Sequence, residues 1–136
     1  MGDAAAQTRS VVVEREVAFP PAKIWRALTQ PHLLQEWLMK NEFAPLGDQR
    51  FRFRSGPVEV ECQVRAVEPE RTLTYTWAAM GAETVVTWTL TPTNGGTRLR
   101  MEHAGFRPDQ PRAFHGARLG WERNLDALEQ VLARPD

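Results

Sequence analysis

Four turn signals divide residues 50–104 into five runs in which apolar and polar residues alternate. The signals are Ser55-Gly56, Pro69-Glu70, Met80-Gly81 and Asn94-Gly95. A two-residue loop fixes the register of the strands that it joins, and a slip by one residue would turn every side chain to the other face. When each signal is taken as such a loop, all four hairpins place their apolar residues on one face. This agreement predicts a curved antiparallel sheet with one covered side.

The predicted register pairs particular residues across the hairpins. On the inner face the expected pairs are Leu90–Leu99, Trp88–Met101, Val86–His103, Tyr75–Val86, Leu73–Trp88, Val64–Tyr75, Ala66–Leu73 and Phe51–Val60. On the outer face, Arg52–Glu59 and Arg50–Glu61 are expected as cross-strand ion pairs. The inner face is therefore apolar except for Tyr75, Cys62 and His103, and we expect Cys62 to be buried as a small hydrophobic residue.

The segments on either side of this meander predict a further strand and three helices. Residues 11–19 alternate like a strand, Pro20-Pro21 ends it, and two short amphipathic helices follow before a loop at 39–49. After residues 108–111, apolar residues recur every three or four positions for about five turns. These residues are Phe114, Ala117, Trp121, Leu125, Leu128 and Leu132. The long helix needs a partner surface, and the concave face of the sheet is the only candidate of that size.

The bulk properties exclude several functional classes. The chain has 136 residues and a formal net charge of zero, which favours neither nucleic acid nor an anionic membrane as a partner. No apolar run approaches the ~20 residues of a membrane helix, and the N-terminus lacks a secretory signal pattern. With Cys62 as the single cysteine, we expect a reducing cytoplasmic location. Residues 1–9 show no periodicity, so we expect a flexible tail before a single domain at 10–136.

Three segments carry a resemblance to a known superfamily. They are FPPAKIWRALTQPHLLQEWL at 19–38, VEPERTLTYTW at 67–77, and VTWTLTPTNGGTRLRMEHAGF at 86–106, which is followed by GWERNLDALEQVL at 120–132. The chain resembles the START-like (SRPBCC, birch-pollen-allergen-like) helix-grip proteins, and within them homologues of the activator of the heat-shock protein 90 ATPase. The implied fold is α+β, with a curved six-stranded antiparallel sheet, two short helices and one long C-terminal helix across the concave face.

The resemblance also implies a cavity between the sheet and the long helix that accepts small hydrophobic molecules. The residues predicted to bind such a ligand are Tyr75, Trp88, Met101, His103, Phe114, Trp121 and Leu125. Ala117 and Gly120 are small enough to leave room, and Met39 and Phe43 are candidates for a lid. The sequence allows either an open cavity or one that is filled by tryptophan side chains.

The polar residues of the inner face allow two interpretations. His103 and Tyr75 flank Val86 at roughly 10 Å from each other, and they could orient the polar end of a ligand. Alternatively, His103 bonds a loop carbonyl and Tyr75 reaches solvent at the rim. Arg15 faces inward if Val13 and Val17 do, and it then meets a ligand carboxylate or extends to the rim.

Catalytic chemistry and metal binding have little support in the sequence. His32, His103 and His115 lie on separate elements without metal-ligand spacing, and no phosphate loop or GxSxG motif is present. We therefore expect no metal and no cofactor, and name no catalytic residue. The leading hypothesis is a non-enzymatic carrier or sensor of a small hydrophobic or aromatic molecule, as monomer or homodimer. The alternatives are a co-chaperone-like domain that stimulates a chaperone ATPase, and a cyclase or hydrolase acting on a polyketide-like substrate.

Overall fold

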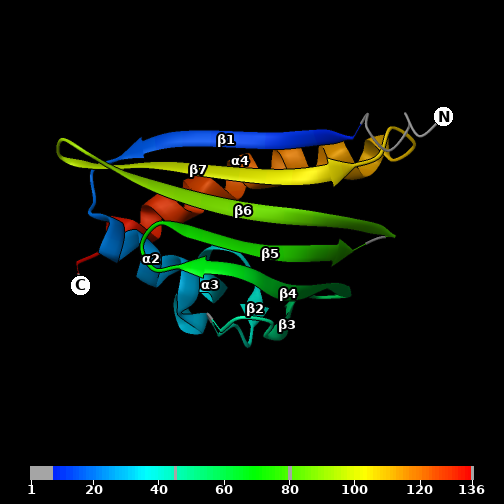
Figure 1. The fold of residues 1–136 in the computed structure, drawn as a ribbon, viewed down its shortest axis with the longest axis horizontal. Coiled ribbons are helices and arrows are strands. Elements are labelled where there is room, and N and C mark those ends of the chain that lie inside the picture. Colours follow the sequence, from blue (N-terminus) through cyan, green and yellow to red (C-terminus); the bar gives the residue numbers. More distant parts are fainter. Residues whose placement is uncertain (1–7, 45, 80, 136) are drawn as a thin grey trace.

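The computed structural model of the chain describes residues 8–44, 46–79 and 81–135. These residues form seven strands and three helices, in two layers (Figure 1). In chain order the elements are β1 (Arg9–Val17), α2 (Pro21–Thr29), α3 (Pro31–Trp37), β2 (Lys40–Asn41), β3 (Arg50–Ser55), β4 (Val58–Glu68), β5 (Thr72–Ala79), β6 (Ala82–Thr93), β7 (Gly96–Phe106) and α4 (Pro111–Leu132). The predicted α+β fold is confirmed.

All seven strands belong to one antiparallel sheet with the order β1-β7-β6-β5-β4-β3-β2. The prediction of six strands differs by one, because the two-residue strand β2 pairs with β3 inside the segment that was expected to be a loop. Two residues give almost no alternation to detect, so the sequence pattern offers no signal for β2. β1 begins at Arg9, and the tail predicted before it lies largely outside the described residues.

The hairpins that join β5 to β6 and β6 to β7 have the predicted register. Leu73 lies across from Trp88 and Tyr75 across from Val86, while β7 continues the register with His103 across from Val86. The β6–β7 turn is Asn94-Gly95, and the glycine has the positive φ of 101° that such a turn needs. In the β5–β6 turn, Met80 lies outside the described residues.

The β4–β5 hairpin has a loop of three residues instead of the predicted two. Glu68 pairs with Thr72, which shifts the register of the adjoining strand positions by one residue. Consequently Val67, and not Ala66, lies across from Leu73. The prediction for this pair was wrong, because the fixed negative φ of Pro69 cannot supply the positive φ that the first loop position of a type I′ or II′ turn requires.

A β-bulge in β4, a few residues before the turn in the chain, removes this shift. The register changes between Val64 and Ala66, so that Arg65 is the extra residue in β4. Val64 therefore pairs with Tyr75 as predicted, and both side chains are buried. The two irregularities of one residue each cancel at Val64. Val64 and Val67 face the core, whereas Ala66, which was expected on the inner face, is exposed.

The β3–β4 hairpin is displaced by two residues from the prediction. Its loop is Gly56-Pro57 rather than Ser55-Gly56, and Phe51 pairs with Cys62 instead of Val60. The glycine has a φ of 59°, as the first loop position of a type II′ turn requires. A shift of two residues preserves which face each side chain occupies, so the inward orientation of this strand was predicted correctly despite the wrong pairing.

The displaced register changes the ion pairs of the outer face. Arg52 lies across from Glu61, yet its guanidinium still reaches Glu59 diagonally at 3.5 Å. Arg50 lies across from Gln63, so the predicted pairing of Arg50 with Glu61 was wrong.

The helices begin where the prolines allow them to begin. Pro21, Pro31 and Pro111 each occupy the first turn of a helix, where a missing backbone N–H costs no hydrogen bond. α4 runs behind the strands, and its C-terminal half lies beside α2 and α3 (Figure 1). Its apolar side chains are buried against the sheet and the short helices: Phe114, Trp121, Leu125, Leu128, Val131 and Leu132. This packing closes one half of the space between the layers.

Candidate functional site

The N-terminal half of α4 leaves a cleft of about 280 Å³ between the helix and the sheet. From the sheet side the cleft is lined by Val58, Val60, Trp77, Ala79, Ala82, Thr84, His103 and Phe106, and from the loop after α3 by Met39. From the helix side it is lined by Arg112, Ala113, Gly116, Ala117, Gly120, Trp121 and Asn124. The cleft therefore lies between the sheet and the long helix, where the family resemblance implies a cavity.

Small residues on one side of α4 produce this space. Ala113, Gly116, Ala117 and Gly120 recur at helical spacing along the cleft. A Cβ atom added at Gly116 or Gly120 would meet no heavy atom within 4 Å. A glycine inside a helix costs roughly 1 kcal/mol of helix stability relative to alanine, so two glycines weaken this half of α4. In return, they place no side chain in the cleft. The expectation that Ala117 and Gly120 leave room agrees with their position.

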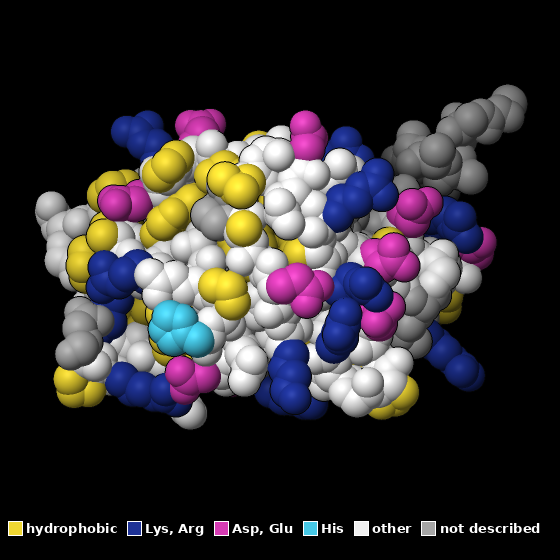
Figure 2. Space-filling model, turned by 90° about the horizontal axis from the view of Figure 1, so that it is seen from below, with side chains coloured by type: hydrophobic (Ala, Val, Ile, Leu, Met, Phe, Trp, Pro, Cys, Tyr) yellow, Lys and Arg dark blue, Asp and Glu magenta, His cyan; other side chains and the backbone are white. Residues whose placement is uncertain are grey.

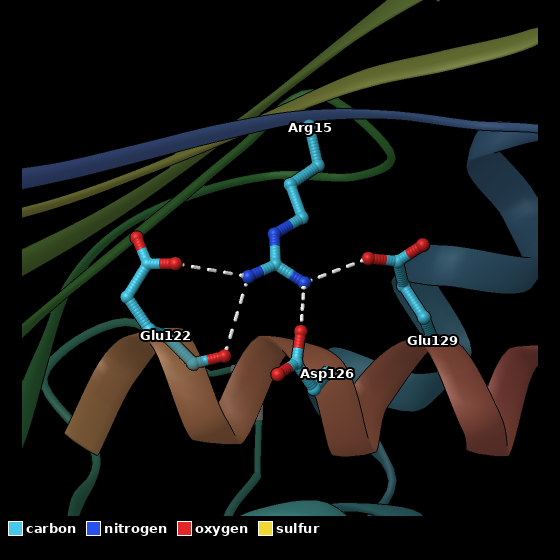
Figure 3. A network of polar contacts seen from close by, with 4 residues as sticks. All are labelled: Arg15, Glu122, Asp126 and Glu129. Atoms are coloured by element: carbon cyan, nitrogen blue, oxygen red, sulfur yellow. Dashed lines mark hydrogen bonds and ion pairs between the residues drawn. The ribbon is translucent and has the colours of Figure 1, made fainter. Parts of the chain in front are cut away.

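The opposite side of α4 is tied to the first strand by Arg15 (Figure 3). Its guanidinium nitrogens lie 2.6 Å from a carboxylate oxygen of Asp126, 2.8 Å from one of Glu129 and 3.2 Å from one of Glu122. It also donates a hydrogen bond to the backbone carbonyl of Glu122 at 3.2 Å. Arg15 thus points from β1 toward the helix, and the carboxylates that it meets belong to the protein itself. This cluster of ion pairs between Arg15 and the three carboxylates of α4, here called the Arg15 clip, holds α4 toward β1 on the side of the helix that faces away from the cleft.

His103 forms the polar part of the cleft floor, and both of its ring nitrogens are engaged. The indole N–H of Trp121 donates to Nδ1 at 2.8 Å, and Nε2 lies 2.6 Å from Oγ1 of Thr84. An indole N–H can only donate, so Nδ1 is the acceptor and the proton of the neutral ring is on Nε2. The Thr84 hydroxyl in turn donates to the carbonyl of Trp77 at 2.8 Å. Each donor in this chain of hydrogen bonds has an acceptor.

Burial lowers the pKa of His103 to about 4. The imidazole is therefore neutral near pH 7, and its basic lone pair on Nδ1 is occupied by Trp121. Neither observation favours proton transfer to or from a ligand. Of the two interpretations for His103, a bond to a loop carbonyl is wrong in detail, because its partners are the side chains of Trp121 and Thr84. The residue does face the cleft.

Tyr75 lies in the core instead of at the cleft or the rim. Its side chain is 1% exposed, and its hydroxyl accepts a hydrogen bond from the indole N–H of Trp88 at 3.0 Å. Burial raises the pKa of this hydroxyl. Phe43 and Phe51 pack against the ring, with centroids 6.2 Å and 5.5 Å away. Phe43 is therefore a core residue rather than part of a lid, and Tyr75 and His103 have separate partners.

The structure separates the predicted ligand-binding residues into two groups. His103 and Trp121 line the cleft, whereas the other five are packed in the core: Tyr75, Trp88, Met101, Phe114 and Leu125. The space beside the C-terminal half of α4 is filled by edge-to-face aromatic packing, with Trp88 between Trp37 and Trp121 at 5.7 Å from each. The question of an open or filled cavity thus has a different answer for each half of the helix.

Residues that the sequence reasoning missed make up most of the cleft wall. Trp77, Thr84 and Phe106 face it from the sheet, and Arg112 and Asn124 face it from the helix. The available signal was the contrast along α4 between small residues in its first half and leucines in its second half. Cys62 is buried as predicted, and burial, with a smaller contribution from the Glu61 charge, raises the pKa of its thiol.

A larger hollow of about 800 Å³ is lined mainly by residues of β3 to β6, and only a few of them, such as Phe51 and Cys62, are buried. Charged side chains of both signs line it, including Arg50, Arg65, Glu61 and Glu83. Seen from the side on which β2, β3 and α3 lie, basic and acidic side chains are interspersed over much of the surface (Figure 2). Such a surface is solvated, so the apolar cleft beside α4 is the better candidate for a ligand site.

The described part of the chain has neither a metal-binding cluster nor a membrane-spanning helix. Its His, Cys, Asp and Glu side chains form no group of three or more that could hold a metal ion. None of its helices is long and apolar enough to cross a membrane.

No curated protein matches the chain. Protein MLL2253 from Mesorhizobium loti shares 52% sequence identity with it and superposes with a TM-score of 0.92, over 94% of this chain and 99% of that one. DynU16, described as a putative protein in the dynemicin biosynthetic locus, shares 25% identity with a TM-score of 0.81, over 90% of this chain and 46% of its own.

A third solved structure, an Aha1 dimer from Colwellia psychrerythraea, shows the same fold. It has 21% identity and a TM-score of 0.80, over 91% of this chain and 96% of that one. The family model described as "Activator of Hsp90 ATPase homolog 1-like protein" matches residues 18–133. This match covers most of the chain and confirms the resemblance seen in the sequence. The protein belongs to the family of activator of Hsp90 ATPase homolog 1-like proteins.

Proposed function

We propose that this protein binds a small hydrophobic or aromatic molecule in the cleft between α4 and the sheet. The observation that carries the proposal is the cleft itself, about 280 Å³ in volume and walled mainly by apolar side chains. Ligand pockets typically combine such walls with a few placed polar groups. Here the polar groups are His103 and Thr84 on the floor, with Arg112 and Asn124 on the helix.

The state of the floor supports an apolar ligand. The two ring nitrogens of His103 and the hydroxyl of Thr84 already bond one another, Trp121 and Trp77. A polar ligand group placed against this floor would lose its hydrogen bonds to water without gaining new ones, which costs about 1–3 kcal/mol. An aromatic or alkyl group incurs no such loss, and it can pack against the rings of Trp77 and Phe106.

The first test is native mass spectrometry of gently purified protein, with extraction of any bound molecule, followed by thermal shifts across a library of small aromatic compounds. The informative variant is Gly120→Leu, which adds a side chain at the cleft wall where space is open. The matched control is Arg118→Leu, which adds the same side chain at an exposed position of α4 outside the cleft.

We expect ligands to raise the melting temperature of the parent protein and of Arg118→Leu, because a ligand that binds only the folded state stabilises it. Gly120→Leu should fold and show no ligand shift. Shifts that are equal in all three proteins would place binding elsewhere and overturn the proposal. The absence of any bound molecule and of any shift would overturn it as well.

The family description favours a second candidate function, stimulation of an Hsp90-type ATPase. The test is the ATPase rate of a bacterial Hsp90 with and without the purified protein. If the protein acts as a co-chaperone through its surface, Gly120→Leu should stimulate the ATPase as well as the parent does. A stimulated rate together with an empty cleft would favour this function over ligand binding. Monomer and homodimer both stay predictions, although the Aha1 structure from Colwellia psychrerythraea is described as a dimer.

A further inference from the structure

We infer that the ligand is an amphipathic monoanion: an apolar body lies in the cleft, and a carboxylate is held at its open edge by Arg112. This inference rests on the proposed function and specifies the chemistry of the ligand. Three observations carry it. The cleft wall holds a single charge, Arg112 has no ion-pair or hydrogen-bond partner among the described residues, and the polar groups on the cleft floor are already bonded to one another.

The cleft wall holds one formal charge among the residues that the structure describes. Of its sixteen lining residues, Arg112 is the only one that is charged near pH 7, because His103 is neutral and no Asp or Glu contributes. A mostly apolar wall with a single uncompensated cation matches a ligand that carries a single negative charge. A dianion would leave one charge unpaired, and a cation would be repelled.

Arg112 is available to bind an anion. Its side chain is exposed, and it forms no ion pair or hydrogen bond with another described residue. Its neighbour Arg107 differs in this respect, because it bonds the carboxylate of Asp109 at 3.1 Å. Asp109 is the acidic residue nearest to Arg112 in sequence, and its charge is thereby compensated.

The position of Arg112 in α4 adds to the attraction for an anion. It is the second residue of the helix, after Pro111. The first backbone N–H groups of a helix have no intrahelical partner, and the helix dipole places partial positive charge at this end. Both effects act in the same direction as the guanidinium charge.

The floor of the cleft is an unfavourable place for the carboxylate of the ligand, because it has no free hydrogen-bond donor among the described residues. The donors there, Trp121 Nε1 and His103 Nε2, are each bonded to a protein acceptor. An anion at the floor would therefore lose its hydration without finding a donor. At the other end of the lining face is Asn124, twelve residues and about 18 Å of helix away, which carries no charge. The anionic group consequently belongs at the Arg112 end.

The test uses two probes of the same shape, 2-naphthoate and 2-naphthamide, which differ in charge. A bicyclic ring suits a cleft of about 280 Å³, because this volume lies just below the roughly 300–1,000 Å³ of pockets that hold drug-sized ligands. Binding is measured by titration calorimetry and by quenching of tryptophan fluorescence, since Trp77 and Trp121 line the cleft. The proteins are the parent, Arg112→Gln, and the control Arg118→Gln, which removes the same charge from an exposed site outside the cleft.

We expect the parent and Arg118→Gln to bind 2-naphthoate about fivefold more tightly than Arg112→Gln does, which is the upper range for an ion pair at an exposed guanidinium. All three proteins should bind 2-naphthamide with the same affinity within about twofold. The naphthoate affinity of the parent should fall as NaCl is added, because an exposed ion pair is screened.

The outcomes distinguish this inference from the function on which it rests. If both probes bind and Arg112→Gln lowers neither affinity, or lowers both equally, the anion site is overturned while ligand binding stands. Tighter binding of the amide than of the carboxylate by the parent has the same meaning. If neither probe binds the parent protein, the inference is overturned, and the proposed function is decided separately by the extraction of bound molecules and the thermal shifts across the compound library.

Discussion

Trp121 donates its indole hydrogen to Nδ1 of His103 across 2.8 Å, and this bond connects the long helix to the polar centre of the sheet. Because the indole can only donate, the bond requires the Nε2–H form of the imidazole. Protonation of Nδ1 would place two N–H groups against each other. The bond thereby links the position of α4 to the protonation state of a buried side chain.

The stability of the protein should depend on pH through His103. Its pKa is about 4 in the folded state and 6.5 in an unperturbed state, so the unfolded chain takes up the proton first as the pH falls. Stability that is present at pH 7 is therefore lost between about pH 6.5 and pH 4, and the loss is about 3 kcal/mol at the full shift. Urea unfolding at a series of pH values measures this slope.

The control for this prediction is His103→Gln, whose amide can accept from Trp121 and donate to Thr84 but does not titrate. The carboxylates that also titrate in this range are common to both proteins, so they cancel in the difference. We expect the difference in unfolding free energy between the two proteins to change by about 3 kcal/mol across the range. A constant difference would contradict the prediction.

Replacement of Trp121 should separate its packing from its hydrogen bond. Its side chain is 2% exposed and lies within 6 Å of three aromatic rings, so Trp121→Ala should lower the unfolding free energy by about 3–5 kcal/mol. Trp121→Phe keeps a ring and removes the donor, which should cost about 1–3 kcal/mol. Chemical denaturation gives both values. A loss below about 1 kcal/mol for alanine would show that the ring packs loosely beside the cleft.

The Arg15 clip should stabilise the protein more than an ordinary surface ion pair does. The Arg15 side chain is 19% exposed and meets three carboxylates of α4. A double-mutant cycle with Arg15→Met and Asp126→Asn should give a coupling of about 1 kcal/mol that decreases at high salt. The comparison pair is Arg98 with Glu16, whose side chains are 54% and 67% exposed and whose coupling should be about 0–0.5 kcal/mol. Equal couplings would remove any special role for the clip.

Gly96 should tolerate no side chain. A Cβ atom at this position would lie 2.0 Å from the backbone carbonyl oxygen of Val17, where β7 begins beside the end of β1. Because backbone must move to relieve the overlap, Gly96→Ala should cost about 3 kcal/mol or more. Gly56→Ala is the control: its φ of 59° is unfavourable for alanine, but no atom lies within 4 Å of the added carbon, so the cost should be about 1–2 kcal/mol. Thermal unfolding that ranks the two variants the other way would contradict this.

The faces of the strands were predictable from the sequence because side-chain alternation tolerates errors that come in pairs. The β3–β4 hairpin is displaced by two residues, and the three-residue turn before β5 is offset by the extra residue Arg65 in β4. The first error moves no side chain to the other face, and the second exchanges only Ala66, which is exposed, for Val67 between the turn and the bulge. The pairings themselves were predictable only where the turn chemistry is definite, as at Asn94-Gly95.

The candidate site was predictable in its layer but not in its position along that layer. Alternation assigns Tyr75 and His103 to the same face, yet it does not tell a core position from a cleft position. That difference depends on the distance between α4 and each strand, which the side chains of both layers set together. His103 and Trp121 line the cleft because the helix above them changes from bulky to small residues, whereas Tyr75 is enclosed by Phe43 and Phe51.

The small residues of α4 at the cleft, from Ala113 to Gly120, are separate from the leucines that bury the other half of the helix and from the acidic residues that Arg15 holds. The residues of α4 that set the volume of the cleft are therefore different from the residues that hold the helix against the sheet. Exchanges among alanine, glycine and larger residues at the cleft positions can resize the site while the remaining contacts keep the helix in place. A scaffold of this kind can change the volume of its cleft through a handful of substitutions, with the sheet unchanged.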